Sequence, residues 1–87
     1  MDTIKQLINE GKIEEAIRLL DDYIQKNNRS EEAYYLRGKA YNKKGDIRQA
    51  LNSYLAAIEI NPDGPAKTAY DSLIHILDFY NKDIYNP

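Results

Sequence analysis

The sequence contains no cysteine, only one histidine, and no apolar run long enough to cross a membrane. Without cysteine the chain cannot form disulfides, use a thiolate in catalysis or bind a metal through sulfur. A membrane helix needs about eighteen or more predominantly apolar residues in succession. The first residues (MDTIK) also lack the basic segment and apolar run of a signal peptide. We therefore expect a cytoplasmic protein.

The chain also lacks an excess of charge of either sign. Its 12 basic and 14 acidic side chains give a net charge of -2. Nucleic acids and anionic membranes attract proteins through a concentrated positive field, so we expect neither as a partner. The densest basic cluster is flanked by acidic residues and has no accompanying nucleic-acid motif. It consists of Arg37, Lys39, Lys43, Lys44 and Arg48.

What the sequence does contain is an internal repeat. Residues 11–17 (GKIEEAI) return 34 positions later as residues 45–51 (GDIRQAL). A fixed period of this length is the signature of a repeat architecture. With 87 residues, the chain has room for one small domain of two such repeats and a cap.

Each copy of the repeat predicts a helical hairpin. A glycine, Gly11 or Gly45, precedes a stripe of apolar residues at helical spacing and suits a left-handed turn between two helices. The helices before these turns are predicted at residues 2–10 and 31–44, with Ser30 as the N-cap of the second. Residues 61–65 (NPDGP) end the fourth helix, and Pro65 begins an amphipathic fifth helix. We therefore expect repeats at 1–29 and 30–63, a capping helix at 64–81 and a non-periodic tail at 82–87.

The second copy resembles the tetratricopeptide repeat, whose period is also 34 residues. The aromatic, small and proline positions that characterise that family are all matched, with Tyr34 in place of the family's tryptophan and Tyr54 in place of its phenylalanine. Gly38 stands at the family's mid-helix glycine, where we expect a close helix crossing opposite Ala50. The family's leucine before this glycine is replaced by Arg37, and the first copy lacks the start of its first helix. The matching positions are Tyr34, Gly38, Tyr41, Ala50, Tyr54 and Pro62.

The resemblance implies an all-α protein: two tetratricopeptide-like helix-turn-helix hairpins and a C-terminal capping helix, an α-solenoid of about five helices. It also implies a non-enzymatic module for protein–protein interaction, an adaptor or scaffold similar to small stand-alone tetratricopeptide proteins of bacteria. Such arrays hold a polypeptide on a concave surface lined by the first helix of each repeat. Carried onto this sequence, that surface predicts a basic strip beside an apolar wall, suited to an acidic and apolar peptide. Its residues are Lys5, Asn9, Tyr35, Lys39, Asn42, Lys43, Leu73 and Ile76.

Alternative interpretations of these residues stay open at this point. Lys39 and Lys43 could be solvated surface charges, and Leu73 and Leu77 could belong to the core. Asp71, His75 and Asp78 share one helix face, but a lone histidine with two carboxylates is more often solvated than a metal site. The sequence has no phosphate loop, no nucleophile elbow and no second histidine for a catalytic triad. We expect no enzyme, no cofactor and no metal.

The tail suggests an alternative function. Asp83, Ile84, Tyr85 and the carboxylate of Pro87 combine acidic and apolar groups, which is the chemistry that the predicted groove would accept. The alternative is a self-assembling structural module whose groove holds its own tail, or the tail of a neighbour in a homodimer. A loosely packed terminus is the simpler interpretation.

Overall fold

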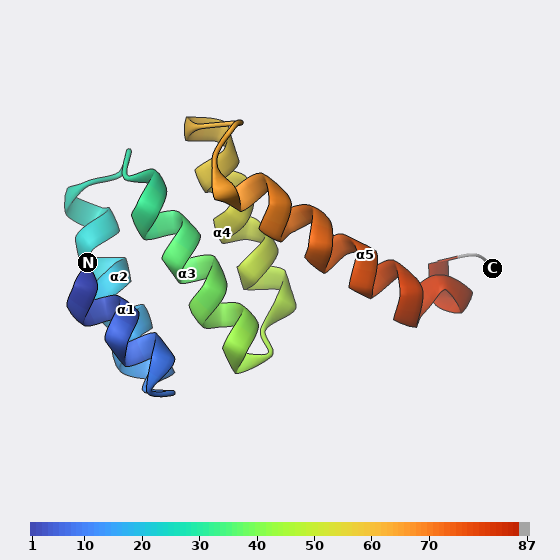
Figure 1. Ribbon diagram of the computed structural model, residues 1–87, viewed down its shortest axis with the longest axis horizontal. Coiled ribbons are helices and arrows are strands. Elements are labelled where there is room, and N and C mark those ends of the chain that lie inside the picture. Colours follow the sequence, from blue (N-terminus) through green and yellow to red (C-terminus); the bar gives the residue numbers. More distant parts are fainter. Residues whose placement is uncertain (86–87) are drawn as a thin grey trace.

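The computed structural model describes the backbone of residues 1–85 and the side chains of residues 1–79 (Figure 1). Within this part of the chain the structure is all-α, with no strand. The helices form two hairpins followed by a single longer helix, as the sequence predicts. They are α1 (Asp2–Asn9), α2 (Ile13–Lys26), α3 (Glu31–Lys44), α4 (Ile47–Ile60) and α5 (Pro65–Tyr85).

Both hairpins turn at a glycine with left-handed backbone geometry. The φ angles are 81° at Gly11 and 90° at Gly45. After α3, the amide of Gly45 donates to the carbonyl of Asn42 (3.1 Å), and the amide of Asp46 donates to that of Tyr41 (3.0 Å). This pair of bonds is the Schellman motif, and the same pair recurs after α1. The predicted glycine turns are therefore confirmed at both positions.

The link between the two repeats is held by side chains at the start of α3. Ser30 is the N-cap of this helix, as predicted, because its hydroxyl accepts a hydrogen bond from the amide of Ala33 (3.2 Å). The carboxylate of Glu31 accepts two bonds from the side-chain amide of Asn61, at 3.1 and 3.2 Å. The start of α3 is thereby joined to the residue that ends α4, which fixes how the second hairpin closes.

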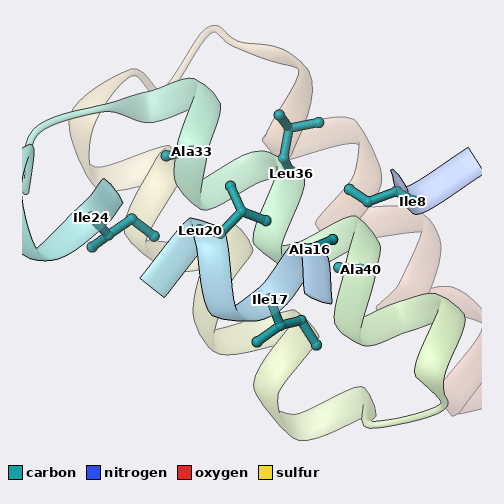
Figure 2. Close-up of a cluster of buried hydrophobic side chains, with 8 residues drawn as sticks. All are labelled: Ile8, Ala16, Ile17, Leu20, Ile24, Ala33, Leu36 and Ala40. Carbon is teal, nitrogen blue, oxygen red and sulfur yellow. The ribbon is translucent and has the colours of Figure 1, made fainter. Parts of the chain in front are cut away.

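The core consists of two clusters that follow the repeats. The first gathers side chains of α1, α2 and α3, among them Ile8, Leu20 and Leu36 (Figure 2). The second joins α4 to α5 and contains Tyr54 and Leu73 with three alanines. Three tyrosines of α3 pack against both clusters, so α3 is the shared wall between them; they are Tyr34, Tyr35 and Tyr41.

Gly38 permits a close approach between α3 and α4, as predicted. A Cβ atom at Gly38 would lie 2.4 Å from Cε1 and 2.5 Å from Cδ1 of Tyr54. The nearest side chain to Gly38 across this crossing is therefore the Tyr54 ring. The tyrosine is buried, with 3% of its surface exposed, because the missing side chain of Gly38 leaves space for its ring.

Arg37 stands at the position where the family has a leucine, and it forms hydrogen bonds with two other helices. Arg37 donates from Nε to the hydroxyl of Ser53 (3.1 Å) and from a terminal nitrogen to Asp21 (3.0 Å). Its guanidinium also lies over the ring of Tyr34, 5.3 Å from the centroid. Because Ser53 is fully buried, Arg37 supplies it with a partner while joining α2, α3 and α4.

The fifth helix continues further than the sequence analysis expected. We predicted its end at residue 81, whereas α5 runs to Tyr85. Residues 82–85 contain no glycine or proline that would end the helix. The next proline in the sequence is Pro87, and a proline disfavours the helical conformation only of the residue before it. In Figure 1, α5 begins beside the end of α4 and leads away from α1 and α3 toward the far end of the long axis. Residues 82–85 therefore do not fold back onto their own groove, and residues 86 and 87 lie outside the described part.

Candidate functional site

The first helices of the two repeats enclose a cleft on one side of the molecule. It has a volume of about 170 Å³. Helix α1 contributes three residues at positions i, i+3 and i+4, and α3 contributes three at positions i, i+1 and i+4, so each helix presents one face. The lining residues are Lys5, Ile8, Asn9, Tyr35, Leu36 and Lys39.

The floor of the cleft is apolar and buried. Ile8 and Leu36 are buried members of the first core cluster and lie at the base of the cleft. The half-buried ring of Tyr35 packs against that of Tyr54, with centroids 6.0 Å apart and planes tilted by 39°. Burial of the Tyr54 phenol, together with the nearby Tyr35, raises the pKa of Tyr54 to about 12. A ligand would therefore meet preformed apolar and aromatic surface.

The rim of the cleft carries two lysines in different electrostatic situations. Lys5 of α1 forms an ion pair with Glu32 of α3, with Nζ and Oε2 3.1 Å apart. The ammonium of Lys39 lies over the ring of Tyr35, 5.6 Å from its centroid. Across the side chains of residues 1–79, no ion pair involves Lys39. Lys39 is therefore the lysine that is available to an acidic ligand without rearrangement.

Four of the predicted surface residues meet in this cleft. Lys5, Asn9, Tyr35 and Lys39 line it together, from two helices that are separated by α2 in the chain. The sequence analysis did not include Leu36 in this surface. The signal was present, because Leu36 lies three residues before Lys39 and so shares its side of α3.

The other four predicted residues do not line the cleft. Leu73 belongs to the second core cluster with 5% of its surface exposed, so its place on the binding surface was wrong and the core interpretation is correct. Lys43 donates from Nζ to the carbonyl of Ile8 (3.3 Å) and so ties α3 to the end of α1. Asn42 is exposed beside it. Ile76 lies on α5 and is 49% exposed.

Several other charged groups form ion pairs between or along helices. Lys44 of α3 pairs with Glu14 of α2 at 2.8 Å, and this hydrogen bond raises the pKa of Lys44. On α5, Lys67 pairs with Asp71, one of the three residues weighed as a metal site. Among the side chains that the structure describes, no group of three histidine or acidic residues could hold a metal ion. None of the described helices is both long and apolar enough to span a membrane.

Comparison with known proteins places the repeat in a family. The sequence model for the tetratricopeptide repeat matches residues 31–63. The solution NMR structure of the Bacteroides fragilis protein BF1650 superimposes with a TM-score of 0.89. Its sequence is 52% identical, over 98% of this chain and 87% of that one. No curated protein matches the sequence. The repeat period, the two helical hairpins and this similarity agree, and the chain belongs to the tetratricopeptide repeat family.

Proposed function

We propose that this protein is a non-enzymatic adaptor that holds a polypeptide segment in the cleft between α1 and α3. Helical repeat proteins of this kind use their concave surfaces for protein–protein interaction. The observation that carries the proposal is the composition of the cleft. A buried apolar floor and a tyrosine lie directly beside Lys39, which has no acidic partner among the described side chains. Peptide-binding sites commonly combine these features.

The proposed ligand is an extended or helical segment with acidic and apolar side chains. An apolar side chain of the ligand would lie against Ile8 and Leu36, which form the floor. A carboxylate next to it in the ligand would reach Lys39, whose ammonium is already placed by the ring of Tyr35. We further propose that residues 1–29 and 30–63 act as the two repeats and α5 as their cap. We also propose a cytoplasmic location and a bacterial origin, and the similarity to a Bacteroides protein supports the origin.

A selection of peptides from a random display library tests this proposal. On the wild-type protein, we expect enrichment of peptides that combine acidic with apolar residues. Lys39→Glu reverses the charge in the cleft and should abolish binding of the selected peptides. Arg48→Glu makes the same charge change on α4, which does not line the cleft, and should leave binding intact. Equal binding to both variants would contradict the proposal.

As an alternative function, we propose self-assembly in trans, with the tail of one molecule bound by the groove of a neighbour. The course of α5, which leads away from α1 and α3, supports this form over one in which the tail binds its own groove (Figure 1). Light scattering of the full chain and of a version that ends at Asn81 tests this form. A dimer that dissociates on truncation would support assembly in trans, and a monomer at high concentration in both cases would refute it.

A further inference from the structure

The ion pair between Lys5 and Glu32 joins α1 to α3, the two helices that line the cleft described above. Lys5 belongs to α1 and Glu32 to α3, and their side chains are 47% and 50% exposed. Lys5 lines the cleft, so the carboxylate of Glu32 neutralises one of its two lysines. Lys39, the other lysine, takes part in none of the ion pairs formed among residues 1–79.

The position of Glu32 on α3 relates this ion pair to the cleft. Glu32 lies one turn before Tyr35 and Leu36 in α3, and both of these residues line the cleft. It also lies in the first turn of that helix, where the helix dipole favours a negative charge. Its carboxylate therefore occupies the place that an acidic group of a ligand would need in order to reach Lys5.

We propose that Glu32 is an internal competitor that restricts the cleft to one ligand carboxylate, the one that binds Lys39. This inference rests on the proposed peptide-binding function. A ligand with two carboxylates gains little from the second one, because each new contact with Lys5 breaks the existing contact with Glu32. Removing the charge of Glu32 frees Lys5 and lets the cleft use both carboxylates.

The size of the effect follows from the exposure of the pair. Half-exposed ion pairs contribute modestly to binding or stability, so a freed Lys5 is expected to strengthen binding of a dicarboxylate ligand about two- to fivefold. The gain should decline as salt is added, because screening weakens the new contact. A ligand with one carboxylate should gain much less.

The experiment uses two peptide probes and three proteins. Both probes have the sequence of residues 83–87 (DIYNP) with a blocked amino end, one with a free terminal carboxylate and the other amidated. The free acid therefore carries two carboxylates and the amide one. The proteins are the full chain, Glu32→Gln and Asp22→Asn. The last is a matched control, because it also removes one exposed, ion-paired carboxylate, but on α2 and away from the cleft. Binding is followed by NMR through amide shifts of the cleft residues, which report millimolar affinities.

The outcomes separate the inference from the function on which it rests. We expect the full chain and Asp22→Asn to bind the two probes nearly equally, and Glu32→Gln to prefer the free acid by about two- to fivefold. If the cleft amides shift but Glu32→Gln shows no such preference, or Asp22→Asn shows the same one, Glu32 is not a competitor and peptide binding stands. If neither probe shifts the cleft amides of any of the three proteins, the acidic-peptide function and this inference are both overturned.

Discussion

Replacing Gly38 by alanine should destabilise the protein, although alanine is the better helix former. The substitution gains about 1 kcal/mol of helix propensity in the interior of α3. Against this, the new Cβ would lie 2.4 to 3.0 Å from three ring atoms of Tyr54, which real Cβ contacts do not show. The ring is buried and already packed against Tyr35, so it cannot simply swing away. Overpacking of this kind costs about 1–3 kcal/mol, and a clash with a rigid ring belongs at the upper end.

The net expectation is therefore a loss of about 1–2 kcal/mol in the free energy of unfolding. For a domain of this size that corresponds to a fall of roughly 4–16 °C in the melting temperature. Urea titrations followed by helical circular dichroism measure the change, with the slope of the transition as a check that unfolding stays two-state.

A double-mutant cycle with Tyr54→Leu isolates the cause. In the Tyr54→Leu background the ring is gone, and Gly38→Ala should become stabilising by about 0.5–1 kcal/mol. Gly45→Ala is the control, because its cost comes from the backbone and should be the same in both backgrounds. The reasoning is refuted if Gly38→Ala stabilises the protein that retains Tyr54, or if the cycle shows no coupling.

Three further predictions concern other parts of the structure. Gly45→Ala should lower the free energy of unfolding by about 1–2 kcal/mol, because a residue with a Cβ is strained at a φ angle of 90°, although no other atom lies within 4 Å of that Cβ. A denaturation midpoint equal to that of the wild type would contradict this. Arg37→Leu restores the family's residue but leaves the buried hydroxyl of Ser53 without its donor, so it should cost about 1–3 kcal/mol. Adding Ser53→Ala should recover most of that loss, and a further loss instead would show that the hydrogen bond is not the cause. The pKa of Tyr54 is about 12 in the folded protein and 10 in the unfolded chain, so the unfolded chain loses this proton first as the pH rises. The contribution of the neutral Tyr54 phenol to the free energy of unfolding is therefore complete below pH 10 and is lost as pH rises toward 12. Urea titrations across this range should show a shallower decline in Tyr54→Phe, and identical declines would exclude Tyr54 as the origin.

Local features of the fold could be predicted from the sequence because each has a local physical cause. Gly11 and Gly45 are needed where the backbone turns left-handed, and Ser30 is needed where α3 begins with unsatisfied amides. The bounds of α3 follow from these two signals, and they agree with the structure. The 34-residue period then determines which helices form pairs.

The remaining features depend on contacts between distant parts of the chain. The apolar stripe of α5 is continuous, and periodicity cannot show that α4 buries Leu73 while Ile76 stays half exposed. Likewise, Gly38 predicts a close crossing, but its contact with the Tyr54 ring depends on how α3 and α4 are rotated. For the cleft, the face of α3 was predictable, whereas the ion pair of Lys5 with Glu32 requires the packing of α1 against α3.

The measurement that tests the central claim most directly is a map of amide chemical-shift changes on adding a peptide selected on the wild-type protein. We predict that the largest changes fall on the cleft residues of α1 and α3, around Asn9, Tyr35 and Lys39, and that they disappear in Lys39→Glu. Changes confined to α2, or to the exposed side of α5 around Ile76, would contradict the proposal that this cleft holds the partner.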